Sequence, residues 1–231
     1  PRLRLPQVSA WKRGEYLAAA LFIAPGLIWF LGFMLYPLAY SFWMSLHEWK
    51  IRGPSEFVGL ANYARVFADS INLIALRNTI VYALLSVPTQ ILLGLLIALG
   101  LETVTRGKVL LRLIYYLPVI SSWVVVSLMF MFLFNSEGLF NYVFGDVLGL
   151  VNPNTAWLNR ASTALPVIAL LGVWKGMGWS MLIYLAALQS IPAELTEAAR
   201  VDGANRAQVT RFVTVPLLKP TTLFIAVMLT I

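Results

Sequence analysis

The sequence predicts an all-α fold, a polytopic bundle of helices that crosses a membrane several times. Two observations support this fold class. Hydrophobic residues make up 60% of the 231 positions and charged residues 12%, and the mean hydropathy is +0.80. The apolar residues also gather into stretches of roughly 20 residues, which is the length that a helix needs to cross the bilayer core.

Four stretches are long enough to be complete membrane spans, and part of a fifth follows: 17–40, 79–101, 113–134, 165–188, and from Thr221 onward. The fifth reaches only Ile231, which at about 1.5 Å per helical residue is too short to cross a bilayer. We therefore expect the chain to be a fragment of a longer protein. The first stretch is longer than the apolar core of a signal peptide, and no small-residue cleavage site follows it, so we expect it to be retained.

Lys and Arg residues predict the orientation of these spans, because cytoplasmic loops carry an excess of both. Most of those outside the spans fall on one side of the predicted membrane: Arg2, Arg4, Lys12, Arg13, Arg106, Lys108, Arg112, Arg200, Arg206, Arg211 and Lys219. Residues 1–16 would then be a cytoplasmic tail, 41–78 an extracytoplasmic segment and 79–231 the membrane core. A net charge of +7 spread over several loops indicates topology, and we expect no nucleic-acid partner.

Several catalytic chemistries lack their residues in this sequence. There is no cysteine, and His47 is the single histidine, which disfavours disulfides, histidine metal sites and catalytic triads. The nearest approach to a phosphate-binding loop, at 107–109, lacks the upstream glycine and the hydroxyl residue, so ATP would have to bind another polypeptide. No pair of acidic residues lies in a predicted span, which argues against proton coupling and intramembrane acid catalysis.

The loop at 189–220 is long and polar for so apolar a chain: QSIPAELTEAARVDGANRAQVTRFVTVPLLKP. Pro192 suits a first helical turn, and two glutamates follow it near the positive end of the helix dipole. Gly203 permits a chain reversal that residues with a Cβ resist. A second helix is predicted from Ala204 to Thr214, and Pro216 is predicted to end it.

The first of these two helices has a low and mostly apolar face. Leu195, Ala198 and Ala199 lie three and four residues apart, so they share one side of the helix. The two alanines would let the backbone of another protein come close. A helix–turn–helix tied to two spans would act as a lever for a soluble partner. The alternative interpretation is a solvated loop with an incidental helical pattern.

The spacing within this loop resembles the EAA motif of bacterial importer permeases, the membrane subunits of ATP-binding-cassette (ABC) uptake systems. The family pattern is E-A-A, three residues, G, nine residues, I-x-L-P, and its counterparts in this chain are Glu197, Ala198, Ala199, Gly203, Val213, Val215 and Pro216. The two valines are conservative departures. The flanking Asp202, the Ile-Pro pair at 191–192 and the PLLKP ending match the sugar-transporting branch. Residues 54–67 resemble a stretch common in the first of the two permeases of the maltose and glycerol-phosphate importers.

This resemblance implies a type I ABC importer permease-like fold with a six-span core, in a bacterial cytoplasmic (inner) membrane. It implies a second homologous permease, two ABC ATPase subunits that hold ATP and Mg, an extracytoplasmic solute-binding protein and membrane lipid as partners. The chain itself would be non-catalytic and would hold no cofactor. ATP binding would move the loop and shift the spans from inward-facing to outward-facing. The residues implied in coupling are Glu197, Ala198, Ala199, Asp202, Gly203 and Pro216.

The fourth span carries most of the residues that we expect along a substrate path. A lysine in the middle of a span costs about 2.5–3.5 kcal/mol on insertion scales, so Lys175 should face a cavity or a partner. It could instead pair with a carboxylate or carbonyl of the second permease. Aromatic rings with a few polar groups suit sugars, although each ring could equally pack against helices or lipid. The candidates are Trp174, Lys175, Trp179, Ser180, Tyr184 and, from the second span, Gln90.

Proline and glycine also mark the predicted spans. Residues 88–90 in the second span, and Pro118, Ser121 and Ser122 in the third, predict kinks with polar groups facing inward. A GxxxG pair at 172–176, followed by another glycine, lets helices approach closely.

The predicted function is that of a permease subunit that moves a carbohydrate by ATP-driven alternating access. Glycerol phosphate or another polyol is the alternative cargo, although a phosphate should require several cations and only Lys175 is visible in a span. Two further classes remain as alternatives. An ion-coupled secondary transporter should show an acidic residue in a span, and a membrane enzyme should show an acid or metal site.

Overall fold

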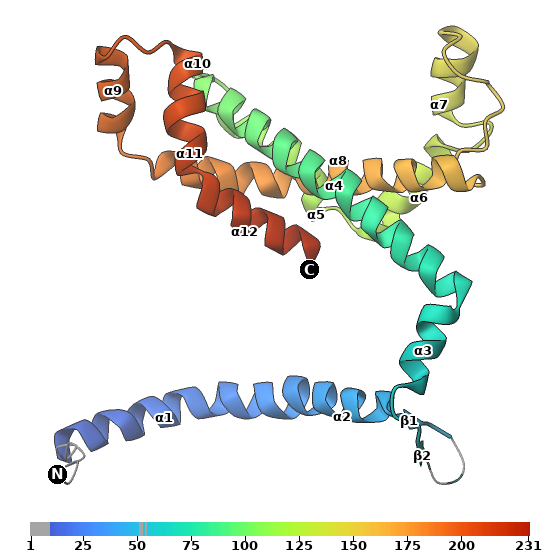
Figure 1. Cartoon of the computed structure of the whole chain (residues 1–231). Helices are drawn as coiled ribbons and strands as arrows, with labels where there is room; N and C mark the ends of the chain where they lie inside the picture. The colour runs from blue at the N-terminus through green and yellow to red at the C-terminus, as the bar shows by residue number, and fades with distance from the viewer. Residues whose placement is uncertain (1–9, 51–52, 54) are drawn as a thin grey trace. The chain divides into compact units, whose positions relative to one another are not determined.

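The computed structural model describes residues 10–50, 53 and 55–231, and for residues 10–13 it describes the backbone alone. Arg2, Arg4, Arg52 and most of the predicted tail at 1–16 lie outside the described residues. The chain divides into two compact units, residues 1–74 and 75–231. Figure 1 colours the chain from blue to red along the sequence.

The first unit is built on one long helical run. It consists of α1 (Ala10–Phe30), a π-helical turn η1 (Leu31–Leu35) and α2 (Tyr36–Ser45). Large apolar side chains are exposed along this run, and aromatic rings stack at helical spacing, as Trp29 does on Phe33 with ring centroids 4.1 Å apart. A helix that is apolar all round is suited to a membrane interior or to the core of an assembly.

A short hairpin and a helix complete the first unit. Strand β1 (His47–Glu48) pairs antiparallel with β2 (Glu56–Phe57), and α3 (Ala61–Ala68) follows. Asn62 ties these parts together, because its Nδ2 donates to the backbone oxygens of Ser45 at 2.8 Å and His47 at 2.9 Å. The segment predicted to be extracytoplasmic is therefore partly folded, and its small sheet departs from the all-α pattern.

The second unit is helical. Its elements are α4 (Ser70–Thr103, which begins at the end of the first unit), α5 (Lys108–Ile120), α6 (Trp123–Leu133), α7 (Leu139–Asn141), η2 (Tyr142–Val147), α8 (Ala161–Gln189), α9 (Ala193–Val201), α10 (Arg206–Val209), η3 (Thr210–Thr214), α11 (Val215–Leu217) and α12 (Lys219–Thr230).

Helix α8 lies at the centre of this unit. In Figure 1, α4 crosses α8 and α12 starts beside its loop end. Helices α5 and α12 both contact α8. The main apolar core forms where α4, α8 and α12 meet, from Ala98, Leu101, Met181, Tyr184, Leu185, Leu218 and Ile225. These side chains are mostly aliphatic and fill the space between the helices, and the one polar group among them, the Tyr184 hydroxyl, donates to Thr222.

Glycines allow α4 and α5 to approach α8 closely. A Cβ on Gly94 of α4 would lie 2.6 Å from the Cβ of Ser180. A Cβ on Gly176 would clash with the side-chain oxygen of Gln90, and one on Gly178 would clash with the backbone oxygen of Tyr115. The small residues of the fourth predicted span are therefore helix-packing positions, as their spacing predicts.

Three helical runs are long and apolar enough to cross a membrane: Gly14–Ser45, Ser70–Thr103 and Ala161–Gln189. Two further pairs of helices reach that length only together. The pair α5–α6 is bent by 93°, and the run from Arg206 to Leu217 is bent by 60° against α12. The described chain thus holds three candidate spans, or up to five if each bent pair is one span.

The third predicted span, 113–134, differs most from expectation, because it is two helices and not one. The backbone is extended at Ser121, with φ −69° and ψ 145°. Pro118 lacks an amide proton, and the hydroxyl of Ser121 donates to the oxygen of Leu117 at 2.9 Å, which competes with helix continuation. The predicted kink is therefore a complete break, which we call the elbow (residues 118–123).

The second and fifth predicted spans need smaller corrections. Helix α4 continues unbroken through Pro88, and the kink predicted there stays a prediction. Gln90 is buried as predicted, whereas Thr89 is exposed and its hydroxyl donates to the oxygen of Leu85 at 2.6 Å. Helix α12 begins at Lys219, two positions earlier than the predicted Thr221.

Candidate functional site

The loop between α8 and α12 begins with α9, which follows Pro192. Helix α9 ends in a Schellman motif. The amide of Ala204 donates to the oxygen of Ala199 at 2.9 Å, and the amide of Gly203 donates to the oxygen of Arg200 at 3.0 Å. Gly203 has a φ of +88°, which residues with a Cβ rarely adopt. Gly203 therefore makes the chain reversal for which the sequence singled it out.

The second helix of the loop begins at Arg206, so the predicted start at Ala204 is wrong. Asn205 caps it through a capping box with Gln208. The Asn205 side chain accepts from the amide of Gln208 at 3.0 Å, and the Gln208 side chain accepts from the amide of Asn205 at 2.8 Å. The sequence analysis missed this pair, although Asn-x-x-Gln is a legible start signal.

Pro216 does not end the second helix, contrary to the prediction. The chain passes from α10 through the π-helical turn η3 into α11, which contains Pro216. A proline is tolerated where the helical hydrogen-bond pattern changes, because the amide that it lacks is not needed there. The bend comes after it, at the buried Leu218.

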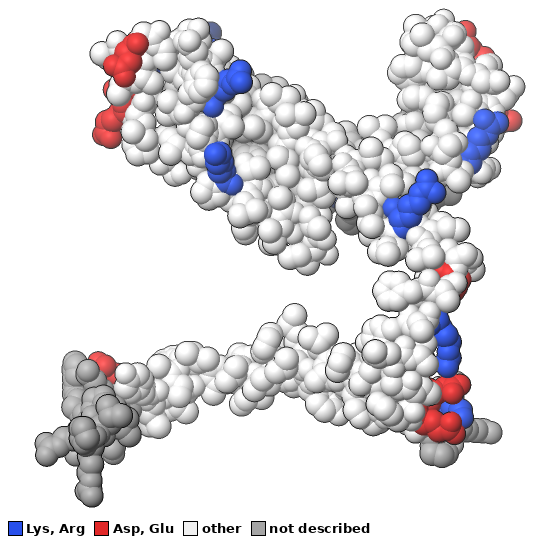
Figure 2. Space-filling view, viewed as in Figure 1, with Lys and Arg blue, Asp and Glu red and all other residues white. Residues whose placement is uncertain are grey.

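The outer surface of α9 is exposed and carries both charge and apolar groups. Glu197, Ala198, Asp202 and Gly203 are exposed, Ala199 is half-buried, and Figure 2 shows acidic side chains gathered on this helix. Val201 is 88% exposed and Leu195 44%. A short helix that leaves two large apolar side chains in water is suited to a protein partner.

A cleft of about 310 Å³ lies behind this loop. It is lined by Leu99, Glu102 and Thr103 at the end of α4, and by Leu188, Ile191, Ala193, Thr196, Arg200, Arg206, Val209, Thr210 and Thr214. The turn between α4 and α5, where Glu102 and Lys108 form an ion pair at 3.5 Å, and the loop at 189–220 therefore lie at the same end of the second unit. The sequence predicts both of them on the same side of the membrane.

Lys175 is buried in the middle of α8, with only 4% of its surface exposed. Its Nζ donates to the backbone oxygens of Pro118 at 2.9 Å, Val119 at 3.1 Å and Ser121 at 2.7 Å. The ring centroid of Trp123 lies 4.8 Å from the same nitrogen. These carbonyls all belong to this chain, whereas the predicted place of Lys175 on a substrate path and its alternative pairing with a second permease stay predictions.

The other candidate path residues do not meet in one open cavity. Gln90 and Ser180 lie in the interface between α4 and α8, and the Ser180 hydroxyl has no hydrogen-bond partner among the described residues. Tyr184 is fully buried and donates to the hydroxyl of Thr222 at 2.9 Å. Trp179 packs against the core, whereas Trp174 is 37% exposed beside Phe130. Their role along a path remains a prediction.

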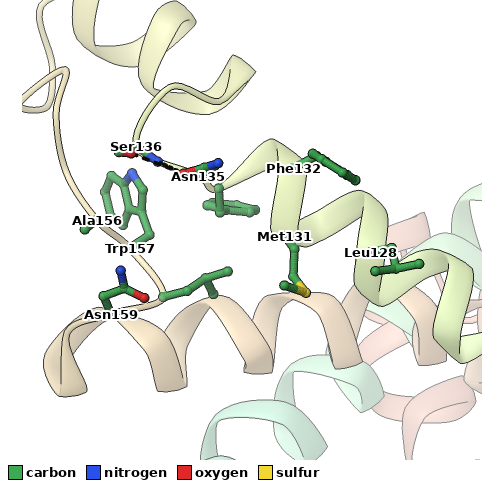
Figure 3. A pocket seen from close by; sticks show the side chains of 10 residues that line it. Leu128, Met131, Phe132, Asn135, Ser136, Ala156, Trp157 and Asn159 are labelled. Atoms are coloured by element: carbon green, nitrogen blue, oxygen red, sulfur yellow. Dashed lines mark hydrogen bonds between the residues drawn. The ribbon is translucent and has the colours of Figure 1, made fainter.

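A second cleft, of about 300 Å³, lies at the opposite end of α8 (Figure 3). Leu128, Met131, Phe132 and Phe134 line it from the α6 side, and Asn135, Ser136, Ala156, Trp157, Leu158 and Asn159 line it from the loops. Asn141, which the sequence analysis missed, organises these loops. Its Nδ2 donates to the oxygens of Asn135, Ser136 and Thr155, and its Oδ1 accepts from the indole of Trp157 at 2.6 Å.

Across residues 10–50, 53 and 55–231, no cluster of three or more His, Asp or Glu side chains could hold a metal ion.

Comparisons with known proteins identify the family. Residues 75–231 match the family described as "Binding-protein-dependent transport system inner membrane component". The probable ABC transporter permease protein YurN of Bacillus subtilis (strain 168) is 36% identical over 215 residues, which are 91% of this chain and 73% of the relative. The lactose transport system permease protein LacF of Rhizobium radiobacter is 33% identical over 225 residues, or 96% of this chain and 74% of the relative. The trehalose/maltose transport system permease protein MalF of Thermococcus litoralis is 34% identical, covering 96% and 75%.

Two solved structures share the fold. A bacterial ABC transporter involved in the import of the acidic polysaccharide alginate superposes with a TM-score of 0.77 at 28% identity, over 95% of this chain and 74% of that chain. A bacterial alginate ABC transporter in complex with an alginate pentasaccharide-bound periplasmic protein gives 0.79 at 28% identity, over 96% and 74%. The predicted all-α membrane bundle and the resemblance to importer permeases are thereby confirmed. The chain belongs to the family of inner-membrane components of binding-protein-dependent transport systems.

Proposed function

We propose that this chain is the permease subunit of an ATP-driven importer and moves a carbohydrate across a bacterial inner membrane by alternating access. The loop from α9 to α11 carries the proposal, because it is a capped helix–turn–helix that joins the central α8 to α12. Relatives named for lactose and for trehalose and maltose, and solved structures of an alginate importer, support a carbohydrate as cargo.

ATP hydrolysis takes place on partner subunits in this proposal. Two ATPase subunits hold ATP and Mg, and one of them receives α9, with Glu197 making a polar contact and the alanine face lying against its backbone. The exposure of Leu195 on that face, and of Val201 at the end of the same helix, supports a docked partner. A second homologous permease completes the membrane pair. An extracytoplasmic solute-binding protein delivers the cargo, in keeping with the periplasmic protein bound to the alginate transporter.

The loop end of the second unit is cytoplasmic in this proposal, and so is the N terminus. The clustering of Arg200, Arg206 and Lys108 at that end supports the orientation, because basic residues accumulate on the cytoplasmic side. The cleft of Figure 3 then opens on the extracytoplasmic side, where cargo arrives.

Coupling follows from the continuity of the chain. Helix α8 ends at Gln189 and α9 begins at Ala193, so a displacement of α9 acts directly on the helix at the centre of the unit. The Schellman turn and the capping box keep the two loop helices from moving independently. Closure of the ATPases would thereby tilt α8 and exchange access between the two ends.

Glycerol phosphate is not favoured as cargo by the described residues. The single lysine of the fourth span uses its three donors on carbonyls of this chain, so it cannot neutralise a phosphate in this conformation.

A gentle-detergent pull-down of the full protein from its native membrane tests the proposal. Mass spectrometry should recover an ATPase and a second permease, and the reconstituted complex should take up labelled lactose or maltose only with ATP. Glu197→Lys should release the ATPase, whereas Glu137→Lys, at the opposite end of the unit, should not. Uptake by this chain alone, without ATP, would refute the importer proposal.

A further inference from the structure

The elbow is held by a side chain from another helix. Pro118, Val119 and Ser121, whose oxygens accept from the Lys175 ammonium, stand at the end of α5, which stops at Ile120. Trp123, whose ring lies 4.8 Å from the same nitrogen, is the first residue of α6. One buried ammonium therefore contacts both arms of the elbow.

A break at this place needs such a group. The last turn of a helix leaves carbonyls without intrahelical partners, and the bilayer core holds no water to satisfy them. An ammonium offers three donors, and here all three point at carbonyls. A positive charge at a helix C-terminus is also favoured by the helix dipole. The cost of burying Lys175 is thus offset by the groups that the break leaves open.

We propose that Lys175 is a positioning residue that fixes the angle of the elbow and ties α6 to the motion of α8. This inference rests on the proposed function, in which the loop at 189–220 is driven by an ATPase. Helix α8 is unbroken from Ala161 to Gln189, so a tilt imposed at its loop end moves Lys175. Lys175 moves the elbow with it, and α6 carries the movement to the cleft of Figure 3.

Close packing beside the lysine supports a rigid link. The backbone of α5 at Tyr115 lies directly on Gly178, one turn further along α8. Trp174, next to Lys175, lies against Phe130 of α6 with ring centroids 5.9 Å apart. Helix α8 therefore contacts α5 through a glycine, α6 through an aromatic pair and the elbow through the ammonium.

Spin labels can measure the elbow directly, because the chain has no cysteine of its own. Leu113→Cys on α5 and Met129→Cys on α6 place labels at exposed positions on its two arms. Leu170→Cys with Ala186→Cys, both exposed on α8, is the control pair. The distance between the two labels of each pair is measured by pulsed electron paramagnetic resonance in the reconstituted complex. The measurement is made with Lys175 intact, with Lys175→Met and with Lys175→Arg.

The Met variant should broaden the elbow distances and leave the α8 pair unchanged, while the Arg variant should stay close to the parent. Transport should fall roughly tenfold with Lys175→Met, at unchanged cargo KM and nearly unchanged ATP hydrolysis. If the Met variant fails to insert, Lys175→Gln, with two N–H donors, should give intermediate broadening.

Two results would overturn the inference. One is an unchanged elbow distribution in the Met or Gln variant. The other is a raised KM for cargo with an intact elbow, which would assign the ammonium to the cargo. A parent complex without ATP-driven uptake would refute the proposed function instead, and the distance measurement would still test the elbow.

Discussion

The second unit breaks its helices in two ways. At residues 202–205 the ends are satisfied by neighbours in sequence, through the Schellman turn at Gly203 and the capping box of Asn205 with Gln208. At the elbow, the carbonyls of α5 are satisfied by Lys175, which is 57 residues from Pro118. The first break lies in a polar, exposed loop and the second in an apolar segment. Where water is excluded, a helix end needs a partner from elsewhere in the fold.

The largest effect in this comparison is expected from tightening the contact beside the elbow. A Cβ in Gly178→Ala would collide with the backbone oxygen of Tyr115 and lie 3.1 Å from Val119. Because backbone must shift to admit it, the variant should lose about 1–3 kcal/mol of stability. Thermal unfolding of the detergent-purified complex measures this loss.

Gly100→Ala is the matched control, because a Cβ there meets nothing within 4 Å in the same kind of helix. It should be neutral or slightly stabilising, since alanine favours a helix over glycine. Equal losses in both variants would show that the α5–α8 contact is not tight.

The water-exposed break should respond to backbone conformation alone. Gly203 is exposed, and a Cβ on it meets nothing within 4 Å, so only its φ of +88° resists substitution. Gly203→Val should cost about 1–2 kcal/mol locally and lower ATP-driven uptake, while the subunit still inserts. Uptake and ATPase binding are the measurements.

Gly203→Asn separates conformation from the mere loss of glycine, because asparagine visits the left-handed region more readily. It should retain most of the uptake. If the Val variant transports as well as the parent, the turn is not part of the coupling path.

A smaller effect is expected from the capping box. Asn205→Ala removes the side-chain acceptor for the amide of Gln208, which should cost about 1 kcal/mol. Amide exchange at Gln208 and Val209 should then be roughly fivefold faster, because local opening sets that rate. Unchanged exchange would mean that η3 and α11 alone hold the second helix.

The two breaks also explain which features of the fold could be predicted from the sequence and which could not. Gly203 and the helix before it follow from local rules, and so does the Asn-x-x-Gln start that was overlooked. The elbow could be predicted only in part from the sequence. Pro118 and the two serines indicate a kink, but no local pattern says that Lys175 fills it, because sequence separation hides the contact. The sequence predicts only that this lysine faces a cavity or a partner, since burial cost alone does not name the group that offsets it.

Pro216 is the clearest local failure, and it gives the smallest expected effect. The helix runs through it to Leu217, and the 60° bend follows at Leu218, ahead of Pro220.

Pro216→Ala should therefore change the free energy of unfolding by no more than about 0.5 kcal/mol and leave the bend angle unchanged. Spin labels at the exposed Phe212 and Leu223, on either side of the bend, measure it. Pro220→Ala should reduce the bend angle instead, because a proline at 220 has no amide to donate to the carbonyl of Pro216, four residues earlier, and its ring crowds that carbonyl. If Pro216→Ala straightens the chain and Pro220→Ala does not, then Pro216 sets the bend angle. The explanation that Pro216 is simply tolerated after the π turn η3 would then be wrong.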